Sequence, residues 1–305
     1  MPTFAIECVV ECQNNVGESP IWDIETGELW WVDSTGRRVG RPSIFRWNPK
    51  TDVLREWSLD LDIGSIALRR DGGLVLAGGD GIYVFDPDRG ELERRCTVET
   101  MGGRLRLNDG KCDREGRFYV GGMDDKEELK AASLYRLDPD FTLTEIDTGI
   151  ICSNGPCFSP DNRTFYFADT FQDEIWAYDF DLTSGTVANR RLFSRTDAAG
   201  GVADGSTVDA EGYLWNAELI SGNLVRYAPD GTVDRRIGMP VRNVTSVMFG
   251  GDGLDDIYVT TMARVMHPAV HDRFVAETRP QFGAGALFRI RGLGIRGLPE
   301  TRFAG

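Results

Sequence analysis

The chain repeats one short pattern six times. Each copy begins with a polar or small residue, runs into a short apolar segment, turns, and continues with a second and a third apolar segment. We refer to the first residues of the copies as the anchors, and they are Glu18, Gly64, Asn108, Asn154, Asp204 and Thr245. They are 46, 44, 46, 50 and 41 residues apart. A period of about 40–50 residues with about four strands per copy is typical of a β-propeller.

The segments within each copy are typical of strands. The second is rich in aromatic or branched residues, as at 165–167, and the third usually ends in Asp-Pro or an equivalent pair, as at 82–87. A weaker fourth strand follows in most copies, for example at 92–95. No helical periodicity of useful length competes with this pattern. The sequence therefore predicts an all-β fold, a six-bladed β-propeller with four-stranded antiparallel blades.

The last copy lacks a fourth strand of its own. The segment Ala5–Val10 lies before the first anchor and has the right character to supply it. We therefore expect an N-terminal strand to close the ring and leave no open sheet edge. Since no linker interrupts the repeats, residues 1–305 are predicted to form a single propeller domain.

Charge and composition narrow the possible partners. The net charge is −14 and no basic run is present, so nucleic acid and anionic membrane surfaces are not expected to bind. The first residues lack the features of a signal peptide, and no apolar run approaches the ~20 residues that span a membrane. The six cysteines are scattered without a CxxC pair. We expect reduced thiols in a cytoplasmic protein.

Three of the anchors are oxygen ligands. If the repeats surround one axis, the side chains of Glu18, Asn154 and Asp204 converge in the central channel and offer two carboxylates and one amide. A hard divalent cation such as Ca²⁺, Mg²⁺ or Mn²⁺ suits this set, and Zn²⁺ or Fe²⁺ would accept it with water in the open positions. The alternative is that these groups only bond to one another or to channel water. We favour one divalent metal ion of undetermined identity.

Other polar residues lie close to the anchors. Asn108 is a fourth polar anchor that could hold a substrate hydroxyl, or could simply form an Asn-Asp-Gly turn. Arg106 would face the same pocket if the innermost strand has begun there, and otherwise is a surface arginine. The only histidines, His267 and His271, fall in the long 263–286 loop, which we expect to act as a lid or pocket wall. Two histidines cannot make a His₃ zinc site, and no G-x-S-x-G motif accompanies them.

Several motifs around the anchors occur together in one known family. They are Gly17-Glu18-Ser19-Pro20-Ile21-Trp22, Arg106-Leu107-Asn108-Asp109-Gly110-Lys111, Ser153-Asn154-Gly155-Pro156, Asp204-Gly205 with Val208-Asp209-Ala210-Glu211-Gly212, Thr245-Ser246-Val247-Met248-Phe249-Gly250-Gly251, and the ending that begins at Arg291. In this order, and over essentially the whole chain, the sequence resembles the senescence marker protein / gluconolactonase / regucalcin-like family.

The resemblance implies a six-bladed propeller with one catalytic divalent metal, in a family whose members are mostly sugar lactonases. It implies that Glu18, Asn154 and Asp204 are the metal ligands and that Arg106 and Asn108 hold the substrate. Asp204 is also the favoured general base. The expected reaction is the hydrolysis of aldonolactones to aldonic acids.

The sequence departs from the family at two places. Lys126 stands near a position where the family often has Glu, which puts hydroxyl recognition in doubt and could favour a substrate with an anionic group. Ala203 precedes Asp204 where proline is common, a change we expect to be tolerated.

Two other functions remain open at this stage. The same ligands would serve a non-catalytic calcium-binding regulatory protein of the regucalcin type. A related propeller hydrolase acting on phosphotriesters or bulky lactones is less favoured, because the two histidines are poorly placed for it.

Overall fold

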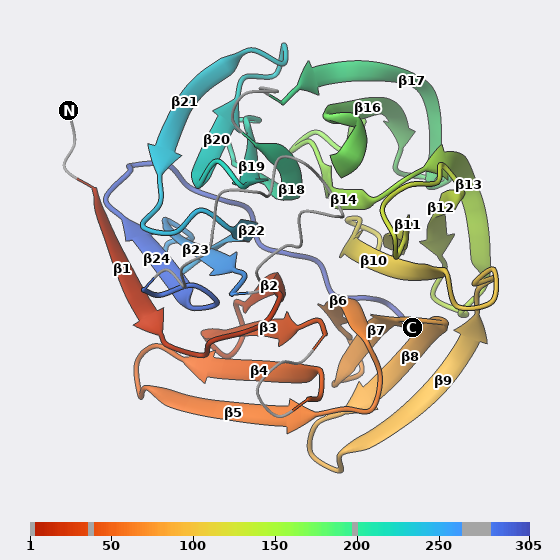
Figure 1. Ribbon diagram of the computed structural model, residues 1–305, viewed down its shortest axis with the longest axis horizontal. Helices are drawn as coiled ribbons and strands as arrows, with labels where there is room; N and C mark the ends of the chain where they lie inside the picture. The colour runs from red at the N-terminus through yellow and green to blue at the C-terminus, as the bar shows by residue number, and fades with distance from the viewer. Residues whose placement is uncertain (1–3, 36–39, 197–200, 264–281) are drawn as a thin grey trace.

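Six four-stranded antiparallel sheets surround a central channel in the computed structural model (Figure 1). The structure describes residues 4–35, 40–196, 201–263 and 282–305. Each sheet is one blade, and its strands follow chain order from the channel outwards in the first five blades. The predicted all-β, six-bladed propeller is confirmed.

The strand bounds follow the repeats. The first blade holds β2 (Gly17–Asp23), β3 (Glu28–Asp33), β4 (Ser43–Asn48) and β5 (Val53–Ser58). The second holds β6 (Ile63–Leu68), β7 (Leu74–Gly78), β8 (Gly81–Asp86) and β9 (Glu91–Thr97). The third holds β10 (Leu105–Cys112), β11 (Phe118–Asp124), β12 (Ala132–Leu137) and β13 (Leu143–Ile150).

The remaining blades are built in the same way. The fourth holds β14 (Ser153–Phe158), β15 (Thr164–Asp169), β16 (Glu174–Asp181) and β17 (Thr186–Arg195), with the short 3₁₀ helix η1 (Thr170–Gln172) after β15. The fifth holds β18 (Val202–Val208), β19 (Leu214–Leu219), β20 (Asn223–Tyr227) and β21 (Val233–Gly238). The sixth holds β22 (Val244–Gly250), β23 (Asp256–Thr261), β24 (Leu287–Arg291) and β1 (Ala5–Val10).

The ring is closed by the strand that the sequence predicted. β1 pairs antiparallel with β24, from Ala5 opposite Arg291 to Cys8 opposite Phe288. The sixth blade thus combines three strands from the end of the chain with one from its beginning. This pairing covers a sheet edge that would otherwise expose unpaired backbone groups.

Each innermost strand contains one extra residue where it passes its anchor. In β2 the pairing jumps from Glu18 opposite Val32 to Ile21 opposite Trp30, and comparable shifts occur at the anchors of the other five blades. At Glu18, Asn108, Asn154 and Asp204, two residues of the innermost strand lie opposite one residue of the neighbouring strand. At Gly64 and Thr245 the anchor itself is the single unpaired residue. Such β-bulges turn a side chain away from the regular alternation of the sheet.

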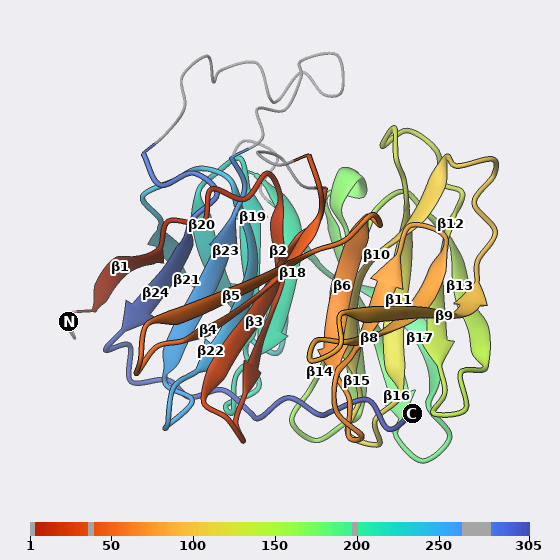
Figure 2. The ribbon, with the colours of Figure 1, turned by 90° about the horizontal axis from the view of Figure 1, so that it is seen from below.

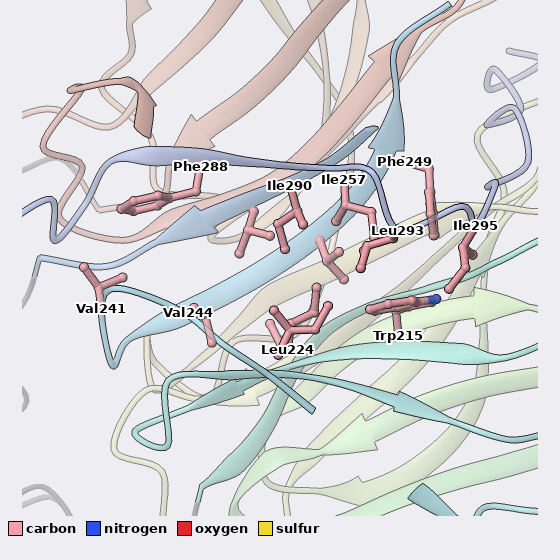
Figure 3. Close-up of a cluster of buried hydrophobic side chains, with 14 of the residues drawn as sticks. Trp215, Leu224, Val241, Val244, Phe249, Ile257, Phe288, Ile290, Leu293 and Ile295 are labelled. Carbon is pink, nitrogen blue, oxygen red and sulfur yellow. The ribbon is translucent and has the colours of Figure 1, made fainter. Parts of the chain in front are cut away.

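Burial decreases from the channel to the rim. Every residue of β6, β14, β18 and β22 is buried, whereas β5 and β9 are almost wholly exposed. The hydrophobic core lies between neighbouring blades, because each sheet buries both faces against the next. Figure 3 shows one such cluster, in which Trp215 and Leu224 of the fifth blade meet Phe249 and Ile257 of the sixth.

The C-terminal segment crosses the face of the propeller that lies away from the anchors. Figure 2 shows residues after β24 running along the lower side of the molecule. Leu293 and Ile295 join the core cluster of the fifth and sixth blades (Figure 3). Further on, the backbone N–H of Phe303 donates to Leu68 O at 2.7 Å, and that of Ala304 to Gly116 O at 2.9 Å. The segment therefore ties distant blades together.

Among the residues that the structure describes, no helix is long and apolar enough to cross a membrane.

We expect Phe303→Ala to destabilise the propeller. Phe303 is fully buried, packs in a core cluster of the second and third blades, and contacts the ring of Phe141 edge-on. Removing a buried phenylalanine costs about 3–5 kcal/mol of the free energy of unfolding. Chemical denaturation measures this loss, with Phe4→Ala as the control because Phe4 is 41% exposed. Equal effects of the two changes would contradict the idea that the C-terminal segment is part of the core.

Candidate metal and substrate site

Five of the six anchors line one pocket at the end of the channel. The pocket and the solvent at its mouth together occupy about 590 Å³. The lining anchors are Glu18, Asn108, Asn154, Asp204 and Thr245. The predicted convergence of the anchors is therefore confirmed, and Gly64 is the one anchor that is not part of the described lining.

The register shifts explain why the polar anchors face the channel. Glu18 and Asn154 are the last paired residues before the bulge in their strands. Asp204 is one of the two residues that form the bulge in its strand. All three side chains are deeply buried, with exposures of 9% for Glu18, 5% for Asn154 and 6% for Asp204. All three side chains line the pocket, each at or next to the bulge of its strand.

Burial makes the charged forms of these carboxyl groups costly. Loss of solvent raises the pKa of Glu18 well above its ordinary value, and the nearby Asp204 and Asp109 carboxylates raise it further. The pKa of Asp204 is raised in the same way, by burial first and then by the charge of Asp109. Desolvation and mutual repulsion disfavour several negative charges in one channel.

A divalent cation fits this set of donors. Two carboxylate oxygens and one amide oxygen match the preference of hard cations, and a cation would offset the repulsion between the buried carboxylates. No three His, Cys, Asp or Glu side chains gather into a metal cluster within the described part of the chain. A site here would therefore combine Glu18 and Asp204 with the amide of Asn154.

Arg106 and Asn108 form the side of the pocket next to these residues. The Nη1 of Arg106 donates to Asn108 Oδ1 at 2.9 Å, and its Nε donates to Asp125 Oδ1 at 2.9 Å. Asn108 Nδ2 donates to Asn154 Oδ1 at 2.8 Å. The expectation that Arg106 faces the pocket instead of the bulk surface is met.

Lys126 does not lie where the sequence suggested. It is exposed and absent from the described lining, whereas its neighbour Glu127 lines the pocket. The cause is the fold of the loop after β11, which wraps around the buried carboxylate of Asp124. That carboxylate accepts the backbone N–H groups of Glu128 at 3.0 Å and Leu129 at 2.7 Å and two hydrogen bonds from Arg104.

Several other residues line the pocket that were not predicted from the sequence. They are the apolar Val16, Met123, Phe171, Leu219 and Met262, the hydroxyl-bearing Ser34, Thr35 and Thr170, and Cys152. Ser34 and Thr170 follow Asp33 and Asp169, which occupy equivalent positions opposite the residues just before two anchors. The pairs Asp-Ser and Asp-Thr at the ends of two equivalent strands could have predicted that Ser34 and Thr170 line the pocket. The apolar residues carried no such signal, since each lies in an ordinary apolar run.

His267 and His271 lie outside the described residues, as does the rest of 264–281. The expectation of a lid or pocket wall in this loop stays a prediction.

The cysteines are poor candidates for a nucleophile. All six are free, which agrees with the expectation of reduced thiols. Cys152 lines the pocket, but burial raises the pKa of its thiol well above the ordinary value. Burial also raises the pKa of Cys157, to about 12. A thiol must ionise to react, so neither is activated.

We therefore expect iodoacetamide to modify the native protein first at Cys8, the exposed cysteine. Cys112, Cys152 and Cys157 should react only after unfolding, because they are buried. Mass spectrometry of peptides from native and denatured samples measures the order. Fast native modification of Cys152 would contradict the description of this thiol as protonated and enclosed.

The fold and the pocket together define a class: a six-bladed propeller with an oxygen-rich small-molecule site at one end of its channel. Comparison with known proteins is more specific, because residues 16–263 match the family described as SMP-30/Gluconolactonase/LRE-like region. The chain belongs to this family, as the motifs around the anchors suggested.

Curated relatives and solved structures agree with this assignment. The chain is 34% identical to regucalcin of Xenopus laevis and 32% identical to regucalcin of Danio rerio, over the whole of each protein. A calcium-binding protein, regucalcin, from Agrobacterium tumefaciens is 26% identical, with a TM-score of 0.87 over 98% of this chain and 97% of that one. A gluconolactonase from Xanthomonas campestris shares the fold at 21% identity, with a TM-score of 0.70 over 94% and 89% of the two chains.

Proposed function

We propose that this protein is a metal-dependent hydrolase that opens sugar lactones to aldonic acids. The observation that carries the proposal is the convergence of Glu18, Asn154 and Asp204 in the lining of one solvent-accessible pocket. Membership of a family that is named for gluconolactonase supports the choice of substrate class. A pocket rather than a closed cage leaves room for a lactone and for the attacking water.

A divalent cation bound by Glu18, Asn154 and Asp204 would supply Lewis acidity toward the lactone carbonyl. Asp204 accepts a proton from the water whose oxygen attacks the carbonyl carbon. The ring C–O bond then breaks, and the proton passes to the ring oxygen that leaves as a hydroxyl. Arg106 is a hydrogen-bond donor on one side of the pocket and Asn108 lies beside it, where the two residues orient the lactone and Arg106 stabilises charge on the carbonyl oxygen.

A second function uses the same residues without turnover. Relatives of this chain are named regucalcin, and one solved neighbour is a calcium-binding protein. A calcium-binding regulator would need the cation site but no open face. The open pocket and its polar side favour the enzyme, and a direct assay separates the two functions.

Removal of divalent metal should abolish lactone hydrolysis. Purified protein is assayed by acid release on glucono-, galactono-, xylono- and arabinono-lactones, before and after chelation, and then with Ca²⁺, Mg²⁺, Mn²⁺ or Zn²⁺ restored. We expect at least one lactone to be opened well above the spontaneous rate, with loss on chelation and recovery on metal addition. Spontaneous rates throughout, despite stoichiometric metal, would favour the non-catalytic binder.

Asp204→Asn should lower kcat by about 10²–10⁴, since a positioned general base contributes about this much. The change keeps the shape of the side chain and one ligating oxygen, so metal content is measured in the same samples. Asp252→Asn is the matched control because Asp252 is exposed and pairs with the surface Lys50. Turnover near the native level in metal-loaded Asp204→Asn would remove Asp204 from the mechanism.

Substitutions of Glu127 and Lys126 distinguish a neutral lactone substrate from an anionic one. A carboxylate in the pocket accepts hydrogen bonds from sugar hydroxyls, so Glu127→Gln should raise KM for a neutral lactone about 10-fold or more. Lys126→Ala should leave that KM within about 2-fold, since the side chain is exposed. If instead Lys126→Ala impairs an anionic lactone and Glu127→Gln is silent, the earlier suggestion of an anionic substrate is right.

A further inference from the structure

Two asparagine amides lie side by side at the candidate metal site, and only their oxygens can bind a cation. Resting on the cation site of the proposed function, we propose that Thr170 is a positioning residue that holds the Asn154 amide with its oxygen toward the metal. The hydroxyl of Thr170 does so by accepting a hydrogen bond from the amide nitrogen, Asn154 Nδ2, at 2.8 Å.

The orientation of the first amide follows from its partners. A guanidinium only donates and a backbone carbonyl only accepts. Arg106 Nη1 lies 2.9 Å from one end of the Asn108 amide, which must therefore be Oδ1. Ser153 O lies 3.0 Å from the other end, which must be Nδ2. The Asn108 amide is thus fixed at both ends, without reference to the metal.

The orientation of Asn154 follows from that of Asn108. Asn108 Nδ2 lies 2.8 Å from the Asn154 amide, and this contact is a hydrogen bond only if Asn154 presents Oδ1. A flipped Asn154 would set two NH₂ groups against each other. The nitrogen of Asn154 then needs an acceptor on the far side, and Thr170 Oγ1 provides it.

Thr170 is held where the acceptor is needed. It is only 2% exposed, and its backbone N–H donates to Cys152 O at 3.0 Å. The carboxylate of the preceding Asp169 accepts the N–H groups of Ile151, at 3.2 Å, and of Cys152, at 3.1 Å. The segment that carries Thr170 is therefore fastened to the segment that carries Asn154. In this buried position, loss of the hydroxyl would leave the Asn154 amide nitrogen with Cys152 Sγ, at 3.7 Å, as a weaker acceptor.

The first blade offers an internal comparison. Ser34 occupies the position of Thr170 there: it follows Asp33, its N–H donates to Val16 O at 2.8 Å, and it lines the pocket with the ligand Glu18. The two oxygens of a carboxylate are chemically equivalent, so Glu18 has no wrong orientation to avoid. A hydroxyl should matter for cation binding in the blade that uses an amide, and not in the blade that uses a carboxylate.

The test is the affinity of metal-free protein for Mn²⁺, measured by titration calorimetry on the full chain. Thr170→Val removes the acceptor and keeps the shape, and we expect Kd to rise about 10-fold or more, the usual effect of removing a group that orients a ligand. Thr170→Ser keeps the hydroxyl and should stay within about 3-fold of the native Kd. Ser34→Ala should do the same. Thermal unfolding of the metal-free variants checks the fold, and Thr170→Ala replaces Thr170→Val if that variant does not fold.

The outcomes separate this inference from the proposed function. If the native protein binds no Mn²⁺, the cation site itself is wrong. If the native protein binds Mn²⁺ and Thr170→Val binds it equally well, Thr170 has no positioning role. A loss in Thr170→Ser as large as in Thr170→Val, or a matching loss in Ser34→Ala, would also overturn the inference, because the effect would not follow the hydroxyl that contacts Asn154.

Discussion

The one extra residue in each innermost strand is the constraint on which the site depends. A regular strand sends successive side chains to opposite faces of its sheet, and in a propeller both faces pack against neighbouring blades. The register shift at each anchor breaks this alternation where the strand enters the channel. A polar anchor can then face the channel while the rest of the strand stays in the hydrophobic core. Without the bulge, Glu18 or Asp204 would compete with apolar side chains for space between blades.

The same constraint creates the electrostatic problem that the site solves. Bringing Glu18, Asp204 and Asp109 to one buried place raises the pKa of each carboxyl group, chiefly through loss of solvent. Hydrogen bonds relieve part of the cost: Asp109 accepts the N–H groups of Gly110 and Gly155, both at 2.8 Å. Glu18 and Asp204 face the pocket, where a cation can balance their charge. A bound cation would therefore stabilise the fold at the same place where it serves the proposed reaction.

Much of the fold was predictable because it is repeated. Six copies of one pattern average out local ambiguity, so the blades, the anchors and even the closing strand Ala5–Val10 follow from the sequence. The meeting of Glu18, Asn154 and Asp204 follows from the same symmetry. Features present in only one copy were harder to predict. The loop around Asp124 turns Glu127 inward and Lys126 outward through backbone hydrogen bonds that no residue pattern announces.

The register shifts and the contacts of Thr170 were hidden for another reason. A bulge changes the pairing between two strands, and this pairing cannot be predicted from the sequence of either strand alone. The hydrogen bond from Asn154 to Thr170 joins side chains 16 residues apart across a hairpin, so it emerges only when both strands are placed. The C-terminal segment likewise has the sequence of an irregular tail, although its backbone is hydrogen-bonded to the second, third, fifth and sixth blades.

The most direct test of the account is to locate a metal. Crystals grown with Mn²⁺ and measured near its absorption edge would give an anomalous difference map. We expect one strong peak in the channel, about 2.0–2.6 Å from carboxylate oxygens of Glu18 and Asp204 and from Asn154 Oδ1, the range for hard cations with oxygen ligands. Two results would contradict the claim that these three anchors hold the cation. One is a map with no peak in the channel and a fully occupied Mn²⁺ elsewhere, and the other is a channel peak that is bound by other residues.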